Sequence, residues 1–350
     1  MIAPIPTDEH LGHRGCILAA VLAATLLALP AAAQDFYAGK SLTFIVGSGV
    51  GGGYDLQARL ASRHLGKHIP GHPTIIVQNL PAAGGMAATN YLYGAAPQDG
   101  TVIALVQRGM LLAKLIYPGG ARFEIDRFHW LASLNSETAV TLAWNETAPH
   151  RTTKDLFERE LIVGGIVGVD PETTPRLYNS LIGTRFKVVT GYNTTAQIAL
   201  AIERGEVQGI ADWSWSSIKS VRPGWLTDKK VTLLLQGALK REPELGDLPS
   251  ALDYVKDDAD RKVLELHFTQ KLAARPIIAP PGVPPDRAAL LRAAFNALGK
   301  DREFLTDAER TRQEIGIVGG EEVDKVVKLI VSTPPDIADR YAKAFAPEHK

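Results

Sequence analysis

The sequence predicts an α/β protein made of two doubly wound lobes. Strand-like apolar runs alternate with helix-like segments along most of the chain, as in successive βα units of a parallel sheet. A glycine-rich strand-to-helix turn occurs early in the chain, and a related one in the middle indicates that the same plan is used twice. The 350 residues exceed the roughly 250 to 300 that one hydrophobic core usually supports, even without a leader of residues 1–33.

The first half of the chain contains three of these βα units. We expect strands at 43–46, 74–78 and 102–106, with helices at 56–67 and 85–92 between them. Ligands of open α/β sheets lie outside the carboxyl ends of the strands, so the loops that follow the strands are the candidate binding loops.

The loop after the first strand carries five glycines in the seven residues 47–53 and leads into a helix. Backbone N–H groups and the positive end of a helix suit a carboxylate or a phosphate there, although an ordinary tight turn is the alternative. The glycines fit G-x-G-x-x-G, but Gln78 and Asn79 stand where a dinucleotide fold places its ribose-binding acid, and no lysine follows Gly52. Nucleotide binding is therefore the weaker hypothesis. The candidate ligand-binding residues of this loop are Gly47, Ser48, Gly51, Gly52, Gly53, Tyr54 and Asp55.

Two residues of this half of the chain have alternative roles, and one further loop adds candidates. Asp55 could cap its own helix, which we favour slightly, or accept a ligand ammonium. Arg108, after the third strand, could neutralise a distal carboxylate or form a surface ion pair of little worth. The loop after the second strand adds three small candidates, Ala83, Gly84 and Gly85.

The middle of the chain predicts a second half-site. Strands are expected at 161–163, 186–190 and 207–210, with a helix whose first turn carries Thr173, Thr174 and Pro175 and another at 196–204. Trp213 and Trp215 could form an aromatic wall of a cleft, or either could simply pack between the lobes, and the two alternatives stand even. The candidates of this half-site are Gly168, Asp170, Thr173, Thr174, Tyr192, Asn193, Thr194, Asp212 and Trp213.

Residues 1–33 read as a cleaved export signal. His13 and Arg14 precede the apolar run 16–29, and small residues lie before Gln34. Removing this leader removes Cys16, the only cysteine, so disulfides and thiol catalysis are excluded. With 38 basic and 38 acidic residues, the balance argues against nucleic acid or an anionic membrane surface as partner. No later segment is long and apolar enough to span a membrane.

A set of short motifs resembles the substrate-binding receptors of tripartite tricarboxylate transporters, the periplasmic Bug-type receptors. The motifs follow the family's order over nearly the whole mature chain: G-x-G-G-G-Y-D with Ala58 and Arg59, N-x-P-x-A-G-G at 79–85, A-P-x-D-G-T at 96–101, V-T-G-Y at 189–192, E-R-G-E-V-x-G at 203–209 and A-P-P-G-V-P-P-D-R at 279–287.

The resemblance implies a type II periplasmic binding protein, in which two lobes joined by crossing strands close over a small organic carboxylate. Lobe 1 would comprise residues 34–135 plus 236–350 and lobe 2 residues 136–235, with crossings near 132–145 and 231–238. Backbone amides of the loop at 47–53 and of Ala83 to Gly85 would hold the first carboxylate, and residues 168–174 and 192–195 would close over it. The resemblance further implies a periplasmic monomer without cofactor, metal or enzymatic activity, which delivers its solute to a large and a small integral membrane subunit.

Two other functions stay open at this point. The protein could be a periplasmic sensor for a two-component system, or an enzyme acting on a carboxylate, for which no paired base and nucleophile is evident. His64, His68 and His72 recur every fourth residue, but the helix ends near Pro70 and no acid stands nearby in the sequence. We therefore expect solvated histidines and no metal site.

Overall fold

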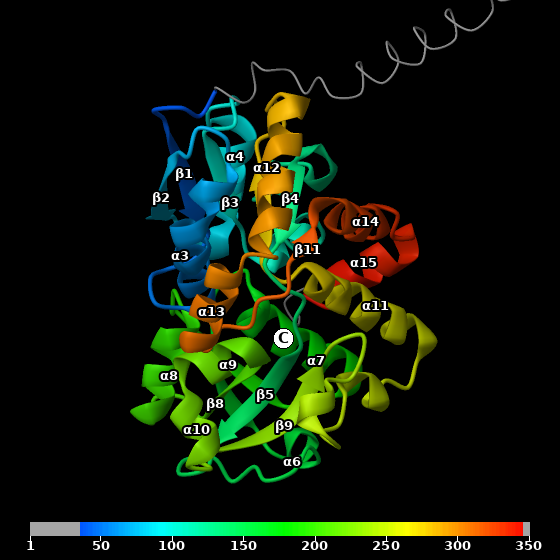
Figure 1. Cartoon of the computed structure of the whole chain (residues 1–350). Helices are drawn as coiled ribbons and strands as arrows, with labels where there is room; N and C mark the ends of the chain where they lie inside the picture. The colour runs from blue at the N-terminus through cyan, green and yellow to red at the C-terminus, as the bar shows by residue number, and fades with distance from the viewer. Residues whose placement is uncertain (1–35, 346–350) are drawn as a thin grey trace, which may run out of the picture.

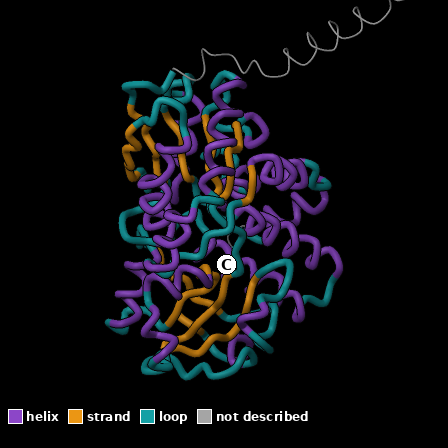
Figure 2. Tube along the Cα trace, in the orientation of Figure 1, coloured by secondary structure: helices purple, strands orange, loops and turns teal. Residues whose placement is uncertain are grey.

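The structure is a computed structural model that describes residues 36–345, so the predicted leader at 1–33 lies outside the described residues. Two sheets lie one above the other, each covered by helices (Figure 1), and Figure 2 shows their strands as two separate groups. The predicted two-lobed α/β fold is confirmed.

The first sheet has the strand order β11-β4-β10-β3-β1-β2. Its strands are β1 (Ser41–Val46), β2 (Thr74–Asn79), β3 (Val102–Leu105), β4 (His129–Ser133), β10 (Pro276–Ala279) and β11 (Val318–Gly319). β1 pairs in parallel with β2 and β3, as the βα units predict. β10 returns from the other lobe and pairs antiparallel with β3 and β4.

The second sheet repeats this arrangement in the order β7-β6-β8-β5-β9. Its strands are β5 (Ala139–Trp144), β6 (Leu161–Gly165), β7 (Phe186–Thr190), β8 (Gly209–Ser214) and β9 (Val231–Gly237). β6 is parallel to β7 and β8, whereas the crossing strand β5 is antiparallel to β8 and β9. Each sheet thus contains one crossing strand: β10 lies between β3 and β4 in the first sheet, and β5 lies between β8 and β9 in the second.

Helices and loops join these strands and cover the sheets (Figure 1). The α-helices of the described residues are α3 (Gly53–Leu65), α4 (Met86–Gly94), α5 (Ala113–Ile116), α6 (Asp155–Glu158), α7 (Asp170–Ile182), α8 (Thr195–Glu203), α9 (Trp215–Val221), α10 (Pro223–Thr227), α11 (Asp258–Thr269), α12 (Pro285–Leu298), α13 (Arg302–Arg310), α14 (Gly320–Val331) and α15 (Pro335–Lys343). Across residues 36–345, none of the helices combines the length and apolarity that crossing a membrane requires.

The core explains why β1 can present its loop at the centre of the molecule. Phe44 packs edge-to-face on Phe295 of α12, with ring centroids 6.5 Å apart, in one core cluster. Ile45, on the opposite face of β1, belongs to another cluster. Burial on both faces is typical of a central parallel strand, and it fixes the position of the glycine-rich loop that follows.

Two sequence-based boundaries differ from the structure. β8 does not end at Ile210 but runs to Ser214, because a bulge with Asp212 at a φ of 58° interrupts the pairing with β5 without ending the strand. α7 begins at Asp170, a turn earlier than Thr173 to Pro175 suggested, since Pro171 already occupies its first turn.

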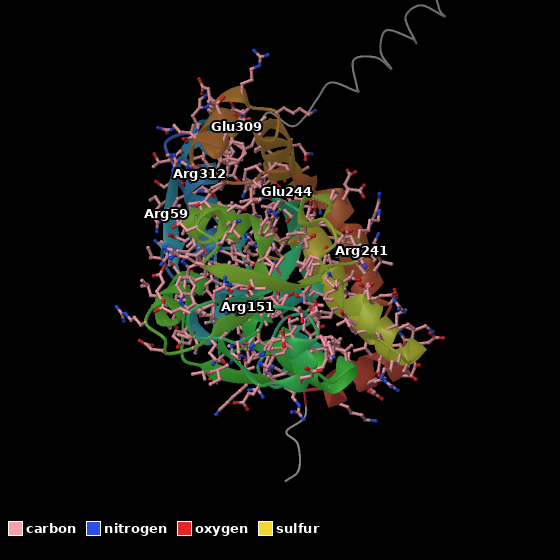
Figure 3. All side chains as sticks on the ribbon, turned by 90° about the horizontal axis from the view of Figure 1, so that it is seen from below. Arg59, Arg151, Arg241, Glu244, Glu309 and Arg312 are labelled. Carbon is pink, nitrogen blue, oxygen red and sulfur yellow. The ribbon has the colours of Figure 1, made fainter. Side chains whose placement is uncertain are left out.

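Basic and acidic side chains are interspersed over the outside of the molecule. Figure 3 shows nitrogen and oxygen tips of both kinds around its outline, with exposed residues such as Arg151 and Glu309 among the labelled ones. The balanced charge of the sequence is therefore also spread in space.

Candidate ligand-binding site

A cavity of about 50 Å³ lies between the two lobes. The first lobe contributes the β1–α3 loop and the turn after β3, and the second contributes the starts of α7 and α8 and the end of β8. One water molecule needs roughly 10–15 Å³ of such space, so the cavity has room for a few waters. The lobes are thus closed on one another.

Part of the predicted set forms the wall of this cavity. The predicted residues on the wall are Ser48, Gly52, Gly53, Tyr54, Arg108, Asp170, Asn193, Thr194, Asp212 and Trp213. The other predicted residues do not lie on this wall: Gly47, Gly51 and Asp55 flank its residues around the start of α3, Gly168, Thr173 and Thr174 around the start of α7, and Tyr192 before α8, whereas Ala83, Gly84 and Gly85 lie in the loop after β2, which contributes nothing to the wall. Whether each of them contacts a ligand stays a prediction.

Asp55 holds the glycine-rich loop in place. Its carboxylate accepts the N–H of Gly51 at 2.9 Å, a hydrogen bond from the Asn79 amide at 2.8 Å and an ion pair with Arg59 at 3.0 Å. Burial favours the protonated form, but Arg59 and these hydrogen bonds outweigh it and lower the pKa of Asp55. Asp55 lies in the first turn of α3, as the cap hypothesis expects, but its carboxylate accepts the N–H of Gly51, ahead of the N-cap residue Gly52, and not an N–H of the first turn. The first turn of α3, with Gly52 as N-cap, has no side-chain cap.

Glycines allow the loops of the two lobes to approach closely. A Cβ atom at Gly84 would lie 2.3 Å from the carbonyl oxygen of Val167, and Gly84 has a φ of 63°. A Cβ atom at Gly49 would lie 2.6 Å from the methyl group of Thr194. The loop of Gly84 therefore lies against the second lobe directly, which explains why it does not reach the cavity wall.

Arg108 forms a buried ion pair across the lobes. Its side chain is 4% exposed, its Nε pairs with Asp170, its Nη2 lies 3.4 Å from Asp212, and its Nη1 donates to Ser214 Oγ at 2.9 Å. Burial opposes the charge, but Asp170 together with Tyr54, Asp212 and Glu137 outweighs it and raises the pKa of Arg108. The alternative of a weak surface pair is wrong, and the guanidinium is already neutralised by protein acids.

A second buried pair lies behind the first. Lys271 binds the carboxylate of Asp212 and donates to the carbonyl of Gly237 at 2.8 Å. Burial lowers the pKa of Lys271. Burial also disfavours the charged form of Asp212, but Lys271 and Arg108 outweigh this and lower the pKa of Asp212. Asp170, Asp212 and His267 have their ligand atoms within 4.8 Å of one another, but the two cations already neutralise the acids. This donor set does not fit a metal ion.

His267 connects this charged cluster to both α7 and α15. Its Nε2 lies 2.7 Å from Thr174 Oγ1, and its Nδ1 lies 2.9 Å from the hydroxyl of Tyr341. Burial lowers the pKa of His267 to about 4, so the imidazole is neutral at neutral pH.

The two tryptophans of the second half-site have different surroundings. Trp213 lies on the cavity wall and also packs edge-to-face on Trp225, with ring centroids 5.8 Å apart. Its buried Nε1 has no hydrogen-bond partner among the described residues. Trp215 is not on this wall, and its Nε1 donates to Glu244 at 2.6 Å. Trp213 therefore lies on the cavity wall, and the packing partner shown for it, Trp225, belongs to the same lobe.

The expectation of solvated histidines holds for His72, which is exposed, but not for His64 on α3 or for His68 in the 3-10 turn that follows it. His64 lies 3.2 Å from Asp307 and His68 lies 2.9 Å from Asp301, both acids coming from the α13 region. Lys67 lies 2.6 Å from Asp301 and 2.5 Å from Glu303, in the place where a cation would bind. These acids are more than 230 positions away in the sequence, so helical spacing alone gave no sign of them.

Nine residues of the cavity wall are not among the candidates named from the sequence: Gln107, Gly109, Ile166, Val169, Pro171, Thr195, Ser214, Ser217 and Arg275. Arg275 precedes β10 directly, and its Nη2 donates to Ser217 Oγ at 2.9 Å. No local motif surrounds Arg275, because it is brought to the cavity only by the return of the chain to the first sheet.

Comparisons with known proteins agree with this architecture. No protein-family model matches the chain. A UPF0065 protein from the TAR-I ttuE-ttuC' intergenic region of Agrobacterium vitis is 30% identical over 179 residues, which are 49% of this chain and 51% of that protein. The chain thus matches about half the length of this curated relative.

Solved structures match over most of the chain. The periplasmic binding protein BugD has 20% identity and a TM-score of 0.66, over 88% of this chain and 98% of BugD. R. palustris Rpa4515 with adipate has 19% identity and a TM-score of 0.67, over 88% and 97%. MatC from Rhodopseudomonas palustris with bound malate has 19% identity and a TM-score of 0.64, over 88% and 99%.

The fold is that of the two-lobed periplasmic binding proteins. The matched structures include the periplasmic binding protein BugD, so the fold that the resemblance implies is confirmed.

Proposed function

We propose that this protein is a periplasmic solute receptor that captures a small organic carboxylate between its two lobes. The observation that carries the proposal is the cavity itself, whose wall combines the uncapped first turn of α3 with side chains of the facing lobe. A ligand shifts such a molecule toward closure only if it contacts both lobes in the closed state, and groups of both lobes on this wall support such contacts. Adipate and malate, named for two matched structures, are both dicarboxylates and support this chemistry.

The proposal extends to export and transport. The signal-like residues 1–33 and the resemblance to Bug-type receptors support a periplasmic location and delivery to the integral membrane subunits of a tripartite transporter. Catalysis is disfavoured, because Asp170 and Asp212, the acids on the wall, are each bound by a cation and neither is free to act as a base.

A thermal-shift screen tests this function. Residues 34–350 are unfolded and refolded to remove carried-over solute, then heated with di- and tricarboxylates, acidic amino acids and aromatic carboxylates. At a hundredfold excess over its Kd, a ligand of the native state adds about 2.7 kcal/mol to the free energy of unfolding. Stabilisation by one of these classes supports a carboxylate receptor, and the absence of stabilisation by all of them contradicts it.

A further inference from the structure

Arg275 is a buried guanidinium without a carboxylate at hydrogen-bonding distance. Its side chain is 1% exposed, and Glu137, with which it forms its ion pair, lies 3.9 Å away. Its Nη2 donates to Ser217 Oγ at 2.9 Å, and its Nη1 lies 3.4 Å from Ser214 Oγ. Its Nε has no partner among residues 36–345. The positive charge is therefore only partly compensated.

A second guanidinium converges on the same point. Ser214 Oγ accepts hydrogen bonds from Arg108 at 2.9 Å and from Arg275 at 3.4 Å, so the two cations lie within two hydrogen-bond lengths of each other. Like charges at this spacing repel strongly where water is excluded. Arg108 has its own partner in Asp170, whereas Arg275 has only the distant Glu137.

The N-terminus of α3 adds further positive potential at this point. Cβ atoms in a helix tilt toward its N-terminus. A Cβ atom at Gly53, the first residue of α3, would lie 2.2 Å from Ser217 Oγ and 3.3 Å from Arg275 Nη2. The guanidinium thus lies beside the first turn of the helix, and Gly53, Ser214, Ser217 and Arg275 all line the cavity.

We infer that Arg275 is the charged contact that binds the ligand's carboxylate, together with the first-turn amides of α3 and the hydroxyls of Ser214 and Ser217. The inference rests on the proposed receptor function. It restricts the ligand to solutes that carry a negative charge on the group that binds Arg275. The ring of Tyr54 lies 4.2 Å from the guanidinium carbon and fixes its plane, while the Tyr54 hydroxyl donates to the carbonyl of Ala274 at 2.9 Å. The stacked ring keeps the N–H groups of the guanidinium oriented for a bidentate contact with a carboxylate.

The test compares Arg275→Gln and Arg275→Lys with the wild type. Acetate, adipate and malate are titrated against chloride at equal ionic strength, with thermal unfolding and calorimetric Kd as readouts. We expect Arg275→Gln to weaken carboxylate binding about ten- to a hundredfold, the range for a buried hydrogen bond to a charged group. The carboxylate affinity of Arg275→Lys should lie between those of the wild type and Arg275→Gln, because an ammonium keeps the charge but cannot form the bidentate contact.

Arg292→Gln is the matched control. Arg292 on α12 binds Asp324 and the carbonyl of Trp130, each at 2.8 Å, and does not line the cavity. Its loss should leave the carboxylate Kd unchanged. Circular dichroism confirms that each variant folds.

The outcomes separate this inference from the proposed function. Equal carboxylate affinity of Arg275→Gln and the wild type overturns the role of Arg275 and leaves the receptor function standing. If Arg275→Gln fails to fold, the wild type is titrated with adipamide, the neutral diamide of adipate. Equal affinity for adipamide and adipate overturns the inference. Loss of binding to adipamide supports it. A wild type stabilised by none of the carboxylate classes of the thermal-shift screen overturns both.

Discussion

Arg108, in the turn after β3, and Asp170, the first residue of α7, form a buried ion pair that joins the two lobes. Their side chains are 4% and 5% exposed, and they are 62 positions apart in the sequence. Burying two charges is costly unless they meet with good geometry. Because the partners come from different lobes, opening would separate them and return both charges to water. The ion pair therefore forms only in the closed arrangement of the lobes.

Asp170→Asn should therefore shift the free protein toward an open arrangement. Removing one partner of a fixed buried pair costs about 3–5 kcal/mol, but here opening lets Arg108 reach water, so the loss of unfolding free energy should be well below that figure. Small-angle scattering should show a larger radius of gyration. Glu203→Gln, which removes a half-exposed pair with Arg222 within the second lobe, is the control, and an unchanged radius in Asp170→Asn would contradict the role of the pair.

Gly84→Ala should prevent full closure. The new Cβ would meet the carbonyl oxygen of Val167 at 2.3 Å, and the φ of 63° adds strain for any residue but glycine. We expect ligand affinity to fall by at least about tenfold, or about 1.4 kcal/mol, while the fold persists.

Two glycines provide graded controls for Gly84→Ala. A Cβ atom at Gly94 meets nothing within 4 Å, so Gly94→Ala should bind as the wild type does. A Cβ atom at Gly52 would lie 3.5 Å from Thr194, an ordinary contact, so Gly52→Ala should have a smaller effect. Wild-type affinity in Gly84→Ala, measured by calorimetry, would show that closure does not require this approach.

Acidification should destabilise the protein through His267. Burial lowers the folded-state pKa to about 4 from an ordinary value of 6.5, so the unfolded chain takes up the proton first as the pH falls. The contribution of His267 to the free energy of unfolding is fully present above pH 6.5. It decreases by on the order of 3 kcal/mol as the pH falls from 6.5 to 4. Urea unfolding across this range measures it.

His267→Gln should flatten that pH dependence, because glutamine keeps hydrogen-bonding atoms near Thr174 and Tyr341 but does not titrate. His129→Gln, at the start of β4, is the matched control variant. A slope that survives in His267→Gln would assign the titration to other groups.

Trp213 should report ligand binding by fluorescence. It is the tryptophan on the cavity wall, among the five of the chain, and its buried Nε1 lacks a hydrogen-bond partner in the described part of the chain. A bound solute that changes the polarity at the indole should alter the emission of the wild type. Trp213→Phe should lose most of this change, whereas Trp215→Phe should retain it; the reverse pattern would place the responding indole elsewhere.

Much of the fold was predictable because its signals are local. Alternating apolar runs and helix-like segments predicted β1, α3, β2 and α4 within a few residues, since strand and helix periodicity depend on near neighbours. The extension of β8 through Asp212 was missed, because a bulge is set by pairing with β5 and not by the sequence of β8 alone.

The candidate site divides in the same way. The sequence by itself determined the two glycine-rich half-sites, because a strand-to-helix turn that packs closely needs residues without side chains over a short stretch. Only the tertiary structure decided which charges are free: it paired Arg108 with Asp170 and Asp212 with Lys271, and it brought the incompletely paired Arg275 to the first turn of α3. Electrostatic partners depend on distance in space, and these partners come from segments that only the closing of two sheets places side by side.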